Sequence, residues 1–334
     1  MKRIRQYSLI FLLLWLTAAA QAAPGKLVGE RDYDLPDWFK FSFLELQDDI
    51  REASQADKHV MLFMHIDRCP YCTALIEENF RKGSNYDYTR KHFDVIALNI
   101  RGDREIAWDK NTAYTEKSLA KKFGIFATPT VLFLNGKGEL VYKMHGYRKP
   151  PAFAHVLHYV AEKQYKKMTL ADYVRQQNET RYTFRSHPQF VSMTDFSRYQ
   201  GPMAVLFEDK SCAECDEFHR EVLMHKSVME ELKPFKLVRL DAYATTPIVD
   251  NNGKPTTPMD WAKSLKLDYR PGMVLFDKGK EITRADGRLY HFHFKEMLRY
   301  VSTGAYRQYA SYIDYLGPRQ KQLLQSGVTI DVSK

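Results

Sequence analysis

All four cysteines of the 334-residue chain fall into two C-x-x-C pairs, Cys69 with Cys72 and Cys212 with Cys215. Such pairs have three interpretations: structural disulfides, one zinc site made from all four thiols, or two redox-active dithiols. A structural disulfide stabilises a protein mainly by closing a long loop, and two intervening residues close almost none. The halves of a zinc site usually lie within a few tens of residues, whereas Cys72 and Cys212 are 140 positions apart. The spacing favours two dithiols and leaves the other two interpretations open.

The first cysteine pair lies between a predicted buried strand and a predicted helix. Residues 59–65 hold a continuous apolar run, which is typical of a strand covered on both faces. Residues 73–80, after the pair, have the apolar spacing of a helix. The later elements of this half are predicted as strands over 93–100, 131–134 and 139–142 and as helices over 119–124 and 153–165. A dithiol that follows a buried strand and opens a helix has the context expected for redox chemistry.

The same order of elements recurs in the second half of the chain. Pro129 lies 60 residues after Cys69, and Pro271 lies 59 residues after Cys212. Apolar strands are again predicted on both sides of the cysteine pair, over 203–207 and 235–240. Several matches in one order indicate an internal repeat. The sequence therefore predicts two tandem domains, residues 30–168 and 185–316, with a polar linker around 176–187 and a C-terminal tail over 317–334.

The first half resembles the thioredoxin family. The residues that carry the resemblance are the motif Cys69-Pro70-Tyr71-Cys72 and the segment Thr128-Pro129-Thr130. It covers about residues 40–165 and looks like the exported thioredoxin-like proteins of the sulfur-oxidation and Dsb type. The resemblance implies an α/β fold class: two tandem thioredoxin-like folds, each with a central mixed β-sheet flanked by helices. The second half is the weaker match, because its dithiol encloses Ala213 and Glu214.

The resemblance also implies which residues contact the substrate. In this family the proline that matches Pro129 is cis, faces the dithiol and exposes the backbone of the preceding residue to an extended substrate peptide. The substrate-binding residues expected on this basis are Thr128, Pro129, Pro70, Tyr71, Arg270 and Pro271. The alternative is that each proline is only a turn residue ahead of a strand.

The expected roles of the cysteines follow from thiol chemistry. A thiolate attacks a disulfide, and a helix N-terminus lowers the pKa of a thiol because unpaired N–H groups and the helix dipole favour the anion. We expect Cys69 and Cys212 to attack, and Cys72 and Cys215 to resolve the mixed disulfide. Glu214 brings a negative charge near Cys212 and is expected to raise the pKa of that thiol.

One departure from the family concerns proton transfer. Many thioredoxins carry a buried aspartate six residues before the first cysteine, and the corresponding residues here are Phe63 and Leu206. An acid of that type is therefore absent from both positions. The nearby acidic residues are expected to be solvated, as is usual at loops and helix ends, and they are Asp67, Glu77, Glu78 and Asp209.

The N-terminus has the pattern of a secretory signal peptide over residues 1–22. A basic start precedes a short apolar run over 9–16, and Ala20-Gln21-Ala22 fits a small-x-small cleavage site. The run is short for a membrane span, although an uncleaved anchor is the alternative. Cleavage would lower the formal net charge from +9 to +6, with basic and acidic residues interspersed. We therefore expect an exported, periplasmic protein that is not integral to the membrane after cleavage and does not bind nucleic acid.

These features predict a periplasmic thiol–disulfide oxidoreductase acting on disulfides and dithiols of exported proteins. Two unlike dithiols in one chain suggest an electron relay between the domains, with a membrane thiol reductase as a further partner. No cofactor and no metal are expected, and the sequence His291-Phe292-His293 is only a weak chelate pattern. The alternative is a thioredoxin-fold module that binds proteins or metals as a chaperone or scaffold without turnover, because a fold does not fix a function.

Overall fold

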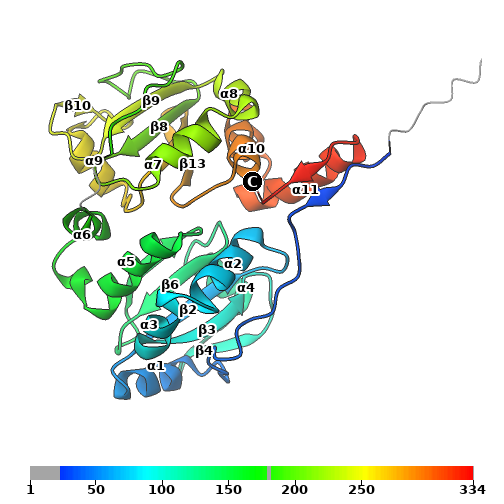
Figure 1. Cartoon of the computed structure of the whole chain (residues 1–334), viewed down its shortest axis with the longest axis vertical. Helices are drawn as coiled ribbons and strands as arrows, with labels where there is room; N and C mark the ends of the chain where they lie inside the picture. Colours follow the sequence, from blue (N-terminus) through cyan, green and yellow to red (C-terminus); the bar gives the residue numbers. More distant parts are fainter. Residues whose placement is uncertain (1–22, 179–181, 334) are drawn as a thin grey trace, which may run out of the picture.

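The computed structural model of the chain describes residues 23–178 and 182–333. The predicted signal peptide, residues 1–22, lies outside this part of the chain. Two lobes of similar plan face each other, and the first runs from blue to green and the second from green to orange (Figure 1). Within the described ranges, no helix combines the length and apolar character that a membrane span needs.

A four-stranded mixed sheet forms the centre of the first domain. Its strands lie in the order β3-β2-β6-β7, with β2 parallel to β3 and antiparallel to β6. Their bounds are β2 His59–His65, β3 Phe93–Asn99, β6 Thr130–Leu134 and β7 Leu140–His145. Every residue of β2 is buried, because alternate side chains enter the two apolar cores on opposite faces of the sheet.

Helices cover both faces of this sheet. Apolar residues of α2, η1, α5 and α6 form the core on one face, while α1 and α4 pack on the other. The helices are α1 Leu46–Gln55, α2 Pro70–Leu75, η1 Ile76–Phe80, α3 Ser84–His92, α4 Glu116–Lys122, α5 Pro150–Ala161, η2 Gln164–Lys166 and α6 Leu170–Gln177. A separate hairpin consists of β4 Glu105–Asp109 and β5 Thr112–Thr115.

The second domain repeats this plan. Its sheet has the order β13-β12-β8-β9, with β8 parallel to β9 and antiparallel to β12. The strands are β8 Met203–Glu208, β9 Lys236–Asp241, β12 Gly272–Asp277 and β13 Lys280–Ala285, with a short pair β10 Ile248–Val249 and β11 Pro255–Thr256. The helices are α7 Cys215–Glu217, η3 Phe218–Leu223, α8 Lys226–Leu232, α9 Pro258–Ser264, α10 His291–Ser302 and η4 Ala305–Arg307. The predicted α/β class, with two tandem mixed sheets flanked by helices, is confirmed.

The C-terminal segment is ordered rather than a tail. Residues 317–325 complete helix α11, Tyr312–Gln325, and β14 Ile330–Asp331 pairs in parallel with β1 Leu27–Val28 (Figure 1). The expectation of a tail over 317–334 is therefore wrong for the described residues 317–333. The physical reason is a small apolar cluster in which Ile330 and Val332 pack on Phe292 of α10.

Two glycines at equivalent places in the repeat bring the domains into backbone contact. Tyr147, after β7, and Arg288, after β13, form an antiparallel bridge, and the Arg288 N–H donates to the Tyr147 carbonyl at 3.1 Å. The preceding residues are Gly146 and Gly287, and a Cβ added to Gly287 would lie 2.8 Å from the His145 carbonyl oxygen and 3.0 Å from the Gly146 Cα. Only residues without a side chain permit this close approach.

Candidate redox sites

Cys69 caps the helix that carries the first dithiol. It is the N-cap residue of α2, Pro70 occupies the first turn, and the Cys72 N–H donates to Cys69 Sγ at 3.0 Å. The two cysteines form a disulfide, in which Cys69 is 4% exposed and Cys72 is fully buried. An N–H aimed at the sulfur and the positive end of the helix both favour a thiolate once the disulfide is reduced.

The predicted proline loop lies over this disulfide. The Thr128–Pro129 peptide bond is cis, and Thr128 Oγ1 lies 3.6 Å from Cys69 Sγ. Residues separated by 59 positions are thus brought together at one site. Pro70 is half-buried and lines the same pocket as Cys69 and Thr128.

The second dithiol has a different local geometry. Cys212 and Cys215 form a disulfide, but helix α7 begins only at Cys215. Cys212 precedes the helix, in a turn where its N–H donates to the Asp209 carbonyl at 3.1 Å. The attacking role expected for Cys212 therefore lacks the helix N-terminus that Cys69 has, because the helix starts three residues later. Ala213 stands where the first domain has Pro70, whose fixed φ preorganises a first helical turn.

An ion pair joins the second proline loop to the turn before Cys212. The Arg270–Pro271 bond is cis, and Arg270 Nε lies 3.0 Å from Asp209 Oδ2, with the two side chains 9% and 5% exposed. Arg270 also donates to the carbonyls of Leu267 and Tyr269, at 2.7 and 3.0 Å. The expectation that Asp209 is solvated is wrong, because the adjacent loop supplies a buried guanidinium partner.

A buried acid–imidazole pair lies beneath the second dithiol. Glu208, four residues before Cys212, and His219, four residues after Cys215, meet at 2.8 Å between Oε1 and Nε2. The Tyr182 hydroxyl donates to Glu208, and the Tyr182 ring packs against both cysteines. Sequence reasoning missed this pair. The sequence feature that could have indicated it is Glu208 at the end of the apolar run MAVLFE. A carboxylate on a buried strand needs a hydrogen-bond partner inside the protein.

Tyr71 of the first motif points into the second domain. Its hydroxyl lies 3.0 Å from His293 Nδ1 and accepts the Tyr290 N–H at 2.9 Å, and its ring stacks on the Tyr290 ring at 5.0 Å. Burial raises the pKa of Tyr71 well above its usual value, and burial lowers the pKa of His293 to about 3. Both side chains are therefore neutral at neutral pH. Tyr71 is 6% exposed, so its predicted contact with substrate stays a prediction.

Charged groups make the equivalent contact at the second dithiol. Glu217 accepts from Lys149, just before α5, and from Arg288, both at 2.6 Å. Burial would raise the pKa of Glu217, but the hydrogen bonds from Arg288 and Lys149 outweigh it and hold that pKa at about 2. Glu214 accepts from the Tyr269 hydroxyl. The first C-x-x-C helix, α2, thus contacts the start of α10 in the second domain, and the second, α7, contacts the start of α5 in the first domain.

The two dithiols open into different pockets. Cys69 lines a pocket of about 420 Å³ whose far wall belongs to α10, α11 and Val332, the residue after β14. Cys212 lines a pocket of about 270 Å³ whose far wall belongs to α5 and α6 of the first domain. Among the described residues, none lines both pockets. In this arrangement each dithiol therefore faces its own binding space.

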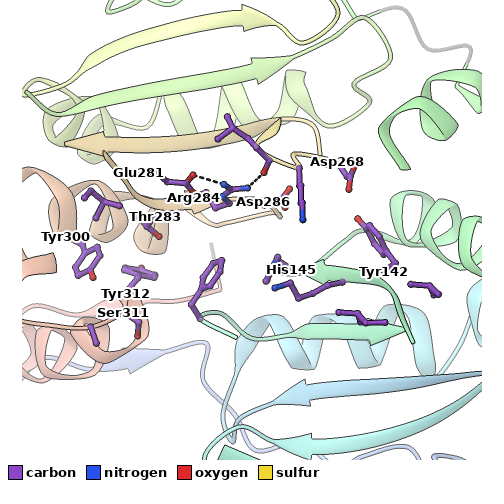
Figure 2. Close-up of a pocket in the computed structure, with 18 residues that line it drawn as sticks. Tyr142, His145, Asp268, Glu281, Thr283, Arg284, Asp286, Tyr300, Ser311 and Tyr312 are labelled. Atoms are coloured by element: carbon purple, nitrogen blue, oxygen red, sulfur yellow. Dashed lines mark hydrogen bonds and ion pairs between the residues drawn. The ribbon is translucent and has the colours of Figure 1, made fainter. Parts of the chain in front are cut away.

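A third cleft, of about 730 Å³, separates the edge strands β7 and β13 (Figure 2). Arg284 spans part of it, donating to both carboxylate oxygens of Glu281 at 2.6 and 2.7 Å and to the Leu265 carbonyl at 2.5 Å. Burial, reinforced by the nearby Lys143, lowers the pKa of His145 on the opposite strand to about 3. Of the described residues that line this cleft, none is a cysteine, so it offers no thiol chemistry.

Metal ligands do not gather in the part of the chain that the structure describes. No group of three or more His, Cys, Asp or Glu side chains in residues 23–178 and 182–333 has metal-binding geometry. In the weak chelate pattern, His293 turns to Tyr71, whereas the His291 ring stacks on His225 at 3.9 Å.

A mixed sheet, a C-x-x-C pair after its central strand and a cis-proline loop beside that pair define each half as a domain of the thioredoxin type. The chain belongs to the family of thioredoxin-like domains, whose model matches residues 46–161 and 189–302. No match was found among curated proteins.

Solved structures similar to this chain each cover one domain's length. A thioredoxin-fold protein from Helicobacter pylori is 23% identical, covering 36% of this chain and 84% of its own, with a TM-score of 0.33. A thioredoxin from Thermus thermophilus is 21% identical, covering 39% and 90%, with a TM-score of 0.30. The oxidised DsbD C-terminal domain from Neisseria meningitidis is 17% identical, covering 35% and 91%, with a TM-score of 0.25.

Proposed function

We propose that the protein is a thiol–disulfide oxidoreductase of the periplasm that acts on disulfides of exported proteins, with Cys69 as the attacking thiol. The observation that carries the proposal is the Cys72 N–H held 3.0 Å from Cys69 Sγ at the start of α2. This contact favours the thiolate that thiol–disulfide exchange requires. Thr128 beside the same sulfur supports a peptide-binding position at the proline loop.

The proposed exchange moves two electrons in two steps. The Cys69 thiolate attacks one sulfur of a substrate disulfide, so that a mixed disulfide forms and the other substrate sulfur leaves as a thiolate. Cys72 then loses its proton and attacks Cys69 Sγ, which releases the second substrate thiolate and forms the Cys69–Cys72 disulfide. The substrate is reduced to a dithiol, and a dithiol donor must reduce the protein before the next cycle. Run backwards, the same steps oxidise a substrate dithiol.

Insulin reduction with dithiothreitol as the donor tests this proposal. The full chain should accelerate the reaction, and Cys69→Ser should abolish the part that depends on the first domain. A chain with Cys212→Ser and Cys215→Ser isolates the first dithiol and is the matched control. No acceleration by any of these proteins would favour the alternative, a binding module without turnover.

The proposed role of the second dithiol is to pass electrons to or from the first. The two pockets are separate, so a direct relay requires the domains to change their arrangement, and a membrane thiol reductase is the proposed partner at one end. In a reconstituted system with such a reductase, Cys212→Ser with Cys215→Ser should stop turnover. Undiminished turnover would remove the support for the relay.

Export to the periplasm is proposed from the N-terminal sequence pattern. Cell fractionation followed by N-terminal sequencing tests it. The mature chain should be found in the periplasmic fraction and begin at Ala23.

A further inference from the structure

Half of the pocket around Cys69 is built by parts of the chain outside the first domain. The near wall comes from the motif loop and the proline loop, with Arg68, Tyr71 and Thr128 among its residues. The far wall carries residues of α10, α11 and the C-terminal strand segment, and these include Met297, Tyr312, Ile313, Leu316 and Val332. A molecule that reaches Cys69 must therefore lie between the first domain and the end of the chain.

Much of the far wall of this pocket is an apolar patch. Met297, Tyr312 and Val332 are buried, and Leu316 and Ile313 are half-buried. Leu316 also packs on the small cluster that contains Val332, so the β1–β14 pair supports this wall from behind. Charges of both signs lie at the near side, where Arg68, Arg101 and Asp67 are exposed and Glu30 is half-buried. Arg288, His293 and Gln320 also line the pocket, at positions around the apolar patch. A patch formed by Met297, Ile313 and Leu316 favours an occupant with an apolar side chain at that place.

The size of the pocket limits what can enter. A volume of about 420 Å³ is within the range of pockets that hold small ligands, about 300–1,000 Å³. A few residues of an extended chain fit such a space, and a folded domain does not. A charged side chain placed directly against Met297 and Ile313 would lose part of its water to apolar atoms, which costs free energy.

We propose that this pocket binds a short, extended polypeptide segment with an apolar residue next to its reactive cysteine, and that Met297, Ile313 and Leu316 determine this specificity. The proposal rests on the proposed function, since it names the substrate class of the same dithiol. The second domain and the C-terminal segment thus supply a substrate-recognition wall for the first domain.

The test uses the full chain with Cys212→Ser and Cys215→Ser, so that only the first dithiol reacts. Two peptides are compared, each with its single cysteine joined to a chromophoric thiol leaving group, and with either leucine or aspartate on both sides of that cysteine. A chromophoric disulfide without a peptide is the third substrate. We expect the reduced protein to react about tenfold faster with the leucine peptide than with the aspartate peptide.

Ile313→Lys introduces a positive charge into the far wall and should reverse the preference. The matched control is Val328→Lys, which adds the same charge on the same C-terminal segment at an exposed position outside the pocket. It should keep the preference for leucine. Urea unfolding of both variants checks that the fold is retained, and Leu316→Gln provides a milder change should Ile313→Lys not fold.

The outcomes separate the two proposals. Equal rates with the two peptides, or a preference that neither Ile313→Lys nor Leu316→Gln changes, would overturn the recognition wall while leaving the oxidoreductase intact. Failure to react with all three substrates, including the disulfide without a peptide, would overturn the proposed function itself.

Discussion

The Tyr71 hydroxyl, inside the first C-x-x-C motif, lies 3.0 Å from Nδ1 of His293 at the start of α10 in the second domain. The two residues are 222 positions apart in the chain. Because the Tyr71 ring also stacks on Tyr290, the redox motif of one domain forms part of the contact with the other. Changes at this contact should therefore alter both the stability of the chain and the access to Cys69.

Tyr71→Phe keeps the ring and removes the hydroxyl. The His293 ring nitrogen and the Tyr290 N–H would then be left without this partner inside the protein, which costs about 1–3 kcal/mol. Urea unfolding of the full chain should show that loss. Tyr86→Phe is the matched control, because the Tyr86 hydroxyl accepts only a surface hydrogen bond from Arg90, and a change within about 0.5 kcal/mol is expected. Equal effects of the two substitutions would contradict the assignment.

Gly287→Ala should weaken the contact between the domains. The new Cβ would lie 2.8 Å from a backbone oxygen and 3.0 Å from the Gly146 Cα, and neither atom can move without shifting its strand. We expect a loss of about 1–3 kcal/mol in the free energy of unfolding. Small-angle scattering should also report a larger radius of gyration. Gly317→Ala is the control, since its Cβ would meet nothing within 4 Å, and it should change stability by less than about 1 kcal/mol.

Arg270→Met should leave the buried Asp209 carboxylate of the second domain without its ion-pair partner. Removing one partner of a buried ion pair typically costs about 3–5 kcal/mol, because the remaining charge has no compensation. Adding Asp209→Asn should recover part of the loss, which a double-mutant cycle measures by urea unfolding. Arg220→Met, which breaks an exposed pair with Glu221, is the control and should cost at most about 1 kcal/mol. The idea fails if the double variant is no more stable than Arg270→Met alone.

Acidification should destabilise the chain in two overlapping pH windows. Burial lowers the pKa of His293 from 6.5 to about 3. Between these pH values the imidazole is protonated in the unfolded chain but not in the folded chain, so the free energy of unfolding falls as the pH drops from about 6.5 toward 3. The pKa of Glu217 is lowered from 4.5 to about 2, since hydrogen bonds from Arg288 and Lys149 outweigh the effect of burial. The stabilisation from that carboxylate is present above pH 4.5 and is lost as pH falls toward 2.

Two variants assign these windows to their residues. His293→Asn should reduce the slope of the unfolding free energy between about pH 6.5 and 3, leaving the part that His145 contributes. Glu217→Gln should reduce the slope below about pH 4.5. Urea unfolding at a series of pH values measures both slopes. Retention of the wild-type slope by His293→Asn would mean that another group is responsible for the first window.

Local features of the sequence were sufficient to predict the repeat and the placement of the first dithiol at the start of a helix. The apolar run before Cys69 and the proline after it can be recognised from neighbouring residues alone. The two proline loops can be recognised from their similar distances to the cysteine pairs, 60 and 59 residues. A fully apolar strand needs cover on both faces, and Pro70 fits only the first turn of a helix. The same features show which residues of the two halves correspond to each other.

The surroundings of the dithiols were decided by the tertiary structure. Arg270 reaches Asp209, Glu208 meets His219, and residues 329–332 turn back onto the N-terminal strand, although nothing near these residues in the sequence indicates those partners. The paired side chains are polar and the C-terminal strand is short, so the local sequence around each is equally compatible with exposure to solvent. The sequence alone determined the two dithiol domains, because periodicity and backbone restrictions act over a few residues. The folding of the second domain and its docking on the first decided what surrounds each dithiol. Such pairings, which include one across 222 positions, depend on the completed packing.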